Sequence, residues 1–250
     1  MATKGTESAN CSAPGAASAS SVPPVAVSIR PVAVLRTPFA EKFGVPRQSG
    51  LVPAAEGRVE FLPEFASPDF VRGIEAFSHL WLVTGFHKNP PWDGAATVRP
   101  PRLGGNERVG VFASRSPLRP NGLGLSLVRL LAAAPGALRV EGIDCVDGTP
   151  VYDIKPYLPY CEAKPEARAD WAGAAPAARL PERILIPDAI AAKLPVEVLT
   201  LARQLLALDL QPAYQAADAG RVYGMTVAGW NLRWRHVGEA VEIVEADRAN

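Results

Sequence analysis

The chain has 250 residues, 20% of them charged, and a formal net charge of +1. This length suffices for a full hydrophobic core and a second small domain. The small net charge excludes a strong overall electrostatic attraction to nucleic acid or to an anionic membrane. No apolar run reaches the roughly 20 residues that a membrane helix needs. The three cysteines lack CxxC spacing, which argues against a disulfide scaffold or a zinc site and fits a reducing cytosol.

The first residues are rich in Ala, Ser, Gly and Pro, and they lack the compact apolar core of a signal peptide. They cannot bury enough apolar surface to offset their chain entropy, so residues 1–27 are expected to be a disordered tail. Weak alternation from Val25 to Leu35 predicts a first strand. The following segment, Glu41–Gly50, is rich in Pro and Gly and charged in its centre, which makes it a candidate binding loop.

The next segments predict elements of different kinds. Gly57–Leu62 predicts a strand, and Asp69–Ala76 predicts a single helical turn. Ser78–Gly85 is apolar on both faces, so it is expected to be a central strand buried on both sides. Pro90–Gly105 is a long irregular connection, and such loops in compact domains are usually functional or disordered.

The chain is organised around Gly110–Leu130, interpreted as a hairpin of two strands that flank the loop Arg115–Gly122. This loop places two guanidinium groups beside two prolines that fix φ. A rigid, cationic loop of this kind suits a carboxylate or a phosphate. Six arginines and one acid, Glu107, lie between Arg99 and Arg129. The alternative is a surface loop made basic for solubility.

The remaining pattern predicts a mainly β protein. Many short strands with few helices between them favour a closed or nearly closed antiparallel barrel. An Ala- and Pro-rich connector, Lys164–Pro181, then leads to a small α+β C-terminal domain. The elements expected after the central segment are strands at Ala137–Asp144 and Val151–Ile154, a helix at Pro195–Asp209, and strands at Arg221–Val227, Trp230–His236 and Ala240–Glu245.

Several common chemistries lack support. The even spacing of His79 and His87 would place both on one face if the strand ran straight through, but a metal would need a third ligand, so no metal site is predicted. His79 is interpreted as a hydrogen-bonded core residue, and His87, beside Lys88, as the better placed to touch a ligand. There is neither a GxSxG elbow nor a GxGxxG motif that opens a helix. Because side chains alternate along a strand, Asp153 and Lys155 are expected on one face. There they could form part of a binding site or a structural ion pair.

Six collinear motifs resemble one family. The chain is similar to the TsaA-like family, whose characterised members are tRNA (adenine-N6)-methyltransferases also called TrmO, over nearly all of its length after the tail. The matching segments are PRQ at Pro46–Gln48, EAFSHLW at Glu75–Trp81, TVRPPRLGGN at Thr97–Asn106, GVFASRSPLRPN at Gly110–Asn121, VDGTPVYDIKPYLPY at Val146–Tyr160 and NLRWR at Asn231–Arg235.

The resemblance implies S-adenosylmethionine as cofactor, a single β-barrel cofactor-binding domain at 28–168 followed by a small domain at 169–250, and a homodimer. It also implies methylation of N6 of the threonylcarbamoyl-adenosine 3′ of the anticodon in threonine tRNA. The cofactor contacts implied are Pro46, Arg47, Gln48, His87, Lys88, Arg115, Leu125, Asp153, Ile154, Lys155 and Pro156.

Within this reading, Arg47 or Arg115 would pair with the methionine carboxylate of the cofactor. Asp153 would hold the cofactor's amino or ribose hydroxyl groups, or accept the proton that leaves N6. The candidates for contact with the anticodon loop are Arg119, Asn121, Tyr214, Arg233 and Arg235. For Arg233 and Arg235 the alternative is an ordinary exposed strand face.

The chain departs from the family pattern at two places. It has Gly122–Gly124 where the family commonly has PIG, which predicts a softer loop. It has Gln211 where the family commonly has arginine; if that arginine contacts tRNA or substrate, its loss would change substrate choice or affinity but not cofactor binding. A methyltransferase acting on a small molecule, and a non-catalytic module that binds cofactor or RNA, remain as alternatives. The implied tRNA substrate and the cysteine pattern predict a cytoplasmic protein.

Overall fold

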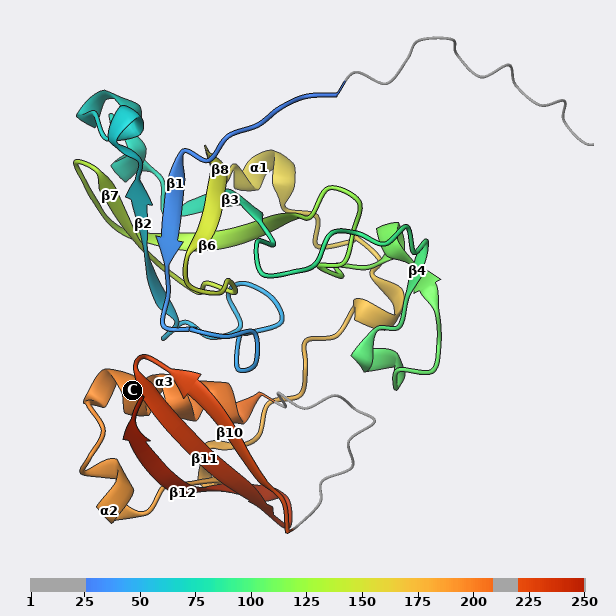
Figure 1. Ribbon diagram of the computed structural model, residues 1–250, viewed down its shortest axis with the longest axis vertical. Helices are drawn as coiled ribbons and strands as arrows, with labels where there is room; N and C mark the ends of the chain where they lie inside the picture. Colours follow the sequence, from blue (N-terminus) through green and yellow to red (C-terminus); the bar gives the residue numbers. More distant parts are fainter. Residues whose placement is uncertain (1–25, 209–219, 250) are drawn as a thin grey trace, which may run out of the picture.

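The computed structural model describes residues 26–208 and 220–249. Its first unit is a closed antiparallel barrel with strand order β1-β2-β7-β6-β3-β8 (Figure 1). The mainly β fold and the barrel expected from the many short strands are therefore confirmed. The barrel strands are β1 (Ala33–Arg36), β2 (Glu56–Phe61), β3 (His79–Gly85), β6 (Leu123–Ala134), β7 (Ala137–Glu141) and β8 (Thr149–Pro156).

The barrel closes around one apolar face of each strand, because side chains alternate along a strand. The buried interior includes Leu35, Val59, Leu80, Leu82, Leu138, Val140 and Val151. β3 lies between β6 and β8, as expected for a central strand. The prediction that both of its faces are buried is wrong, because only one face turns into the barrel and Trp81 and Val83, on the outer face, are half-buried.

Two segments before β3 differ from their predictions. β1 begins at Ala33 rather than near Val25, because Pro31 has no N–H to give to a neighbouring strand, and Val27 is 77% exposed. The single helical turn expected within residues 69–76 is a pair of 3₁₀ turns separated by Gly73, whose φ is 83°. The 3₁₀ turns of this region are η1 (Pro63–Phe65), η2 (Pro68–Val71) and η3 (Ile74–Ala76).

The prediction of a hairpin over Gly110–Leu130 is wrong in its first half. β6 starts at Leu123 as expected, but the arriving strand β5 is only Val109–Gly110 and pairs with β4 (Thr97–Val98). The edge of β6 along residues 123–129 is already occupied by β3, so β5 cannot pair there. Two 3₁₀ turns complete this region, η4 (Pro101–Leu103) and η5 (Val111–Ala113).

The second unit is a sheet of order β10-β11-β12-β9 with α3 beside it (Figure 1). The helix and the three strands predicted near the C-terminus are confirmed. Helix α3 buries its apolar stripe, which includes Val198, Leu201 and Leu205, in the core shared with the sheet. The elements of this part are α1 (Pro159–Glu162), η6 (Asp170–Ala172), η7 (Pro181–Arg183), β9 (Ile184–Leu185), α2 (Asp188–Ala191), α3 (Val196–Ala207), β10 (Val222–Val227), β11 (Trp230–Val237) and β12 (Ala240–Arg248).

The loop that follows β1 seats the barrel on the C-terminal unit. Phe39 forms an isolated bridge with Val227, and the Ala228 N–H donates to the carbonyl of Pro38 at 2.7 Å. Phe43 stacks on Trp234 with ring centroids 6.0 Å apart. These contacts anchor the start of the same loop that continues into Pro46–Gln48, so the C-terminal unit helps to hold that segment in place.

Candidate functional site

The outer face of the barrel brings two of the predicted cofactor residues into one row. Across strands β6, β3 and β8, Leu125 is the register partner of Val83, and Val83 is the partner of Asp153. Because adjacent strands are about 4.8 Å apart, the Cα atoms of Leu125 and Asp153 are about 10 Å apart. Leu125 is 57% exposed. The row therefore offers an apolar side chain and a carboxylate on one open surface.

The next row along the same strands contains Leu127, Trp81 and Lys155. Lys155 Nζ lies 2.9 Å from Asp153 Oδ2, and both side chains are at least half exposed. The predicted common face of Asp153 and Lys155 is confirmed, and it carries an ion pair. Ile154 points the opposite way and packs against the core, so its side chain is not on this face.

The Pro-Arg-Gln segment meets the arginine loop. Gln48 Oε1 accepts a hydrogen bond from Arg115 Nη1 at 2.5 Å. The neighbouring Ser49 Oγ accepts from the Leu127 N–H at 3.1 Å, which fixes the segment along β6. Pro46 is buried, whereas Arg47 is exposed. Two candidate loops that are 67 residues apart in sequence thus lie beside the row formed by Leu125 and Asp153.

The arginine loop is held by short-range hydrogen bonds. Ser114 Oγ donates to the Val111 carbonyl at 2.9 Å, and the N–H groups of Ser116 and Leu118 donate to hydroxyls two residues earlier. Gly122 closes the loop with φ at 58°. Such a loop presents its side chains in fixed positions. Among these side chains, Arg119 is half-buried and Asn121 is exposed.

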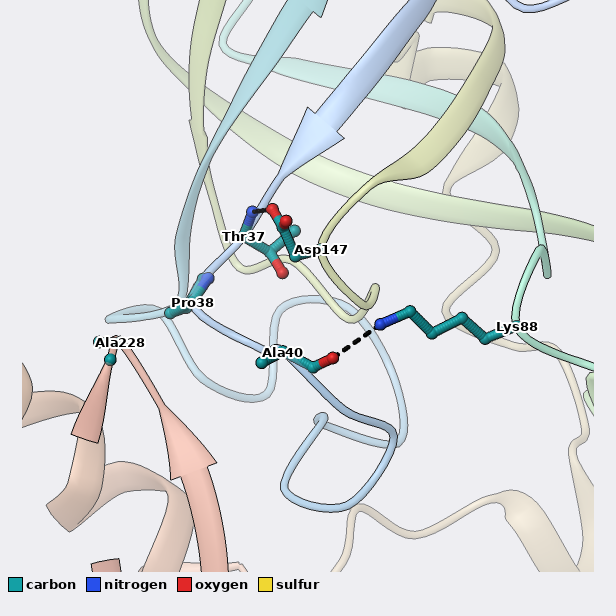
Figure 2. A pocket seen from close by; sticks show the side chains of 7 residues that line it. Thr37, Pro38, Ala40, Lys88, Asp147 and Ala228 are labelled. Atoms are coloured by element: carbon teal, nitrogen blue, oxygen red, sulfur yellow. Dashed lines mark hydrogen bonds between the residues drawn. The ribbon is translucent and has the colours of Figure 1, made fainter. Parts of the chain in front are cut away.

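His87 and Lys88 lie beyond the end of β3, away from that row. Lys88 Nζ donates to the Ala40 carbonyl at 2.7 Å, across a shallow pocket of about 370 Å³ (Figure 2). Asp147 lies in the same pocket and accepts from the Thr37 N–H at 2.9 Å. Burial, and then the charge of Lys88, lowers the pKa of His87. Within the described residues, neither His87 nor Lys88 bonds to Asp153 or Arg115.

Asp144 is a residue that the sequence analysis missed. Its carboxylate accepts from Ser126 Oγ at 2.5 Å and from the backbone N–H of Ser49, and burial raises its pKa. Burial, with the carboxylate beside it, raises the pKa of Cys145 to about 12, so this thiol stays protonated at neutral pH. Asp144 therefore supports the end of the Pro-Arg-Gln segment, at Ser49, from the loop between β7 and β8. An acid at the end of a predicted strand was the available signal.

The raised pKa of Asp144 predicts a pH-dependent stability. As pH rises from the ordinary aspartate value of about 4 toward the raised value, the unfolded chain loses its proton first. The free energy of unfolding of the wild type should therefore fall with pH relative to that of Asp144→Asn. Denaturant titrations of both proteins between pH 4 and 7 measure this difference, and a difference that does not change with pH would contradict the assignment.

The predicted RNA-contact residues divide into groups. Arg119 and Asn121 lie in the arginine loop. Arg233 and Arg235 lie on the exposed face of β11, where they pair with Glu245 and Glu242 at 2.9 and 2.8 Å. This is the arrangement of an ordinary exposed strand face, and their role in RNA contact stays a prediction. Tyr214, like Gln211, lies outside the described residues.

The part of the chain that the structure describes offers little support for a metal site or a membrane span. There, His, Cys, Asp and Glu side chains form no group of three or more that could hold a metal ion. His79 bonds to Ser78 Oγ at 2.9 Å, as expected, but the interpretation of it as a core residue is wrong, because it is half-buried on the outer face of β3 with Trp81 and Val83. None of the described helices combines the length and the hydropathy needed to cross a bilayer.

Comparison with known proteins gives consistent matches. The family described as "tRNA-methyltransferase O N-terminal domain" matches residues 34–163, and the "TrmO C-terminal domain" family matches residues 188–249. The tRNA (adenine(37)-N6)-methyltransferase of Escherichia coli K12 is 42% identical over 85% of this chain and 94% of its own length. The protein of the same name from Eikenella corrodens is 44% identical over 68% of this chain and 97% of its own length.

A solved structure agrees with these matches. The crystal structure of TrmO from Pseudomonas aeruginosa superposes with a TM-score of 0.74 at 33% identity, and the match covers 89% of this chain and 99% of that one. The likeness includes both the barrel and the C-terminal unit.

Proposed function

This chain belongs to the TrmO family of tRNA methyltransferases, and from that premise we propose that it methylates N6 of the adenosine immediately 3′ of the anticodon. It is an S-adenosylmethionine-dependent enzyme. The finer statement, that the target is threonylcarbamoyl-adenosine in threonine tRNA, is part of the proposal. The observation that carries the site is the contact of Gln48 with Arg115 beside the row that contains Asp153.

The residues of this surface suit the proposed cofactor, which supplies a methyl group on a positively charged sulfur. A zwitterionic amino acid end needs a cation and an anion, and an adenine ring needs apolar contact. Arg115 supplies a guanidinium with a neutral partner, Asp153 supplies a carboxylate, and Leu125 supplies an exposed apolar side chain. These three groups supply the cation, the anion and the apolar contact that the cofactor needs, and they do so without a nucleotide-binding crevice.

We assign the carboxylate-binding role to Arg115 or Arg47, because a guanidinium binds a carboxylate through two parallel hydrogen bonds. Gln48 positions Arg115, since its side-chain oxygen holds one of the guanidinium nitrogens. Pro46 is buried and anchors the segment. Lys155 neutralises Asp153 until a cationic group replaces it, and Ile154 and Pro156 hold the strand end. His87 and Lys88 are kept as proposed ligand contacts on the family resemblance alone, because they lie beyond the end of β3 and Lys88 Nζ donates to the Ala40 carbonyl.

Asp153 has two possible roles. It holds the amino or ribose hydroxyl groups of the cofactor, or it accepts the proton that leaves N6. The target nitrogen is a weak nucleophile, so an acceptor close to it would assist the reaction. Holding the nitrogen in line with the methyl group contributes the larger part, since positioning supplies roughly 7 to 11 kcal/mol in favourable cases.

We further propose that the protein acts in the cytoplasm as a homodimer, as its family resemblance implies. Light scattering after size exclusion should then give twice the chain mass of 26.5 kDa. A mass equal to one chain at micromolar concentration would contradict the dimer.

One experiment tests the reaction. The protein is incubated with methyl-labelled cofactor and total tRNA from a strain that lacks the enzyme, and the methylated nucleoside is identified by mass spectrometry. We expect label on an adenosine of the anticodon loop in threonine tRNA. Label found only on small metabolites would favour the small-molecule methyltransferase, and tight cofactor binding without turnover would favour a non-catalytic module.

A further inference from the structure

One segment of the molecule contributes only Lys88 and Arg115 to the proposed cofactor site. Residues 88–121, here called the arginine arm, connect β3 to β6 and contain the two-stranded sheet of β4 and β5. In Figure 1 most of this segment, in green around β4, stands beside the barrel. The arm contains six basic and two acidic residues, a net charge of +4 in a chain whose total is +1. The remainder of the chain is therefore acidic overall.

The arginines of the arm lack carboxylate partners among the described residues. Arg102 Nη2 donates to the Ala174 carbonyl at 2.6 Å, and Arg108 Nη1 donates to Thr97 Oγ1 at 3.0 Å, so these contacts are with neutral oxygens. Arg99 is exposed as well. Many arginines elsewhere face carboxylates, although Arg179 donates to a backbone carbonyl and Arg221 and Arg248 lie over aromatic rings. The pairs are Arg30 with Glu64, Arg36 with Glu60, Arg72 with Asp69, Arg129 with Glu141, Arg139 with Glu56, Arg233 with Glu245 and Arg235 with Glu242.

The same segment carries exposed apolar side chains. Phe112 is 81% exposed, Trp92 is 41% exposed and Leu118 is 47% exposed. Val111 is buried next to Phe112, which fixes the 3₁₀ turn and directs the aromatic ring to solvent. Aromatic rings set among cations are the means by which proteins bind single-stranded nucleic acid, through stacking on bases and contact with phosphates.

The arm is continuous with the proposed site. Asn89 Nδ2 donates to the Pro117 carbonyl at 3.2 Å, which ties the two ends of the arm together at the edge of the barrel. Arg115, between Phe112 and Pro117, contacts Gln48. A chain bound along the arm would therefore lead to the surface that carries Leu125 and Asp153.

We propose that the arginine arm is the tRNA-docking surface, with Arg99, Arg102 and Arg108 on backbone phosphates and Phe112 against an unpaired base. This inference rests on the proposed function, because it takes RNA as the substrate. It differs from the assignment of RNA contact to β11, where Arg233 and Arg235 already have anionic partners. Their carboxylates would have to be displaced or would repel a phosphate.

The test compares two sets of arginine variants in the full-length protein. The triple variant Arg99→Gln, Arg102→Gln, Arg108→Gln is matched with Arg58→Gln and Arg139→Gln, whose arginines pair with acids on β2. Affinity for threonine tRNA is measured at several salt concentrations, and cofactor affinity is measured by calorimetry. A Lys triple at the same positions keeps the charge and tests whether charge alone suffices.

We expect the Gln triple to bind tRNA at least tenfold more weakly and to reduce the slope of log affinity against log salt by roughly 2, as for three phosphate contacts. Cofactor affinity should change less than twofold, and the Lys triple should recover most of the loss. Phe112→Ala should weaken tRNA binding about 5- to 150-fold, by loss of one stacking contact.

Three results would overturn the inference. An unchanged affinity and salt slope in the Gln triple, with wild-type methylation of tRNA, would reject the role of the arm in tRNA docking but not the proposed function. A change of mass in Phe112→Ala from two chains to one, with tRNA affinity per chain preserved, would show that the arm meets a second copy instead. A wild type that neither binds nor methylates tRNA would reject the proposed function together with the arm.

Discussion

Replacing Asp153 by asparagine is expected to lower kcat for tRNA methylation by about 10²- to 10⁴-fold, the range for loss of a proton acceptor. Asparagine keeps an oxygen for the Ile154 N–H, which now donates to Asp153 Oδ1 at 2.9 Å, so the strand end should remain folded. The amide cannot accept a proton at neutral pH. Single-turnover rates with saturating cofactor and tRNA measure the effect without interference from product release.

The same variant separates the two roles of Asp153. If the carboxylate holds the amino or ribose groups of the cofactor, KM for the cofactor should rise and kcat should change little. Asp69→Asn is the matched control, because Asp69 is an exposed acid paired with Arg72 on the far 3₁₀ turn. Wild-type kcat and wild-type KM in Asp153→Asn would exclude both roles.

Arg115→Ala should weaken cofactor binding by about 10- to 150-fold, since a hydrogen bond to a charged group contributes about 1.5 to 3 kcal/mol. Arg115→Lys should recover only part of this loss, because an ammonium group has the charge but not the planar fork. Calorimetry with the cofactor alone measures both constants. The loss of Arg115 also removes a partner of Gln48, so thermal unfolding is recorded in parallel.

Two comparisons make this result interpretable. Arg139→Ala removes an arginine that is paired with Glu56 on the barrel surface, and it should leave cofactor affinity unchanged. Arg47→Ala decides which arginine binds the carboxylate of the cofactor. A large loss in Arg47→Ala with a wild-type constant in Arg115→Ala would assign that role to Arg47 and leave Arg115 as a positioning residue.

The local sequence pattern was sufficient to predict the elements that pack against their neighbours in sequence. β10, β11 and β12 form consecutive antiparallel pairs, and their alternation was visible directly. The apolar stripe of α3 after Pro195 was equally visible. The prediction failed where pairing is long-range. β5 joins β4 and not β6, because β3, more than 30 residues earlier in the chain, occupies the relevant edge of β6.

The face of β6 shows why a pattern does not decide what is buried. Leu123, Leu125 and Leu127 form the more apolar side of the strand, yet Ser126 and Val128 turn into the barrel and Leu125 turns outward. The hydroxyl of Ser126 is acceptable inside because Asp144 accepts its hydrogen bond there. The outward leucine then contributes an apolar group to the proposed cofactor surface.

The sequence by itself determined the family, the mainly β character and the residue types available for chemistry, because these depend on motifs and on alternation within single segments. Only the tertiary structure decided that Gln48 meets Arg115, that Asp153 shares a row with Leu125, and that the arginines of β11 face acids while those of the arm do not. These contacts depend on the order of strands around the barrel. Barrel closure joins segments that are far apart along the chain, and no local pattern records which segments will meet.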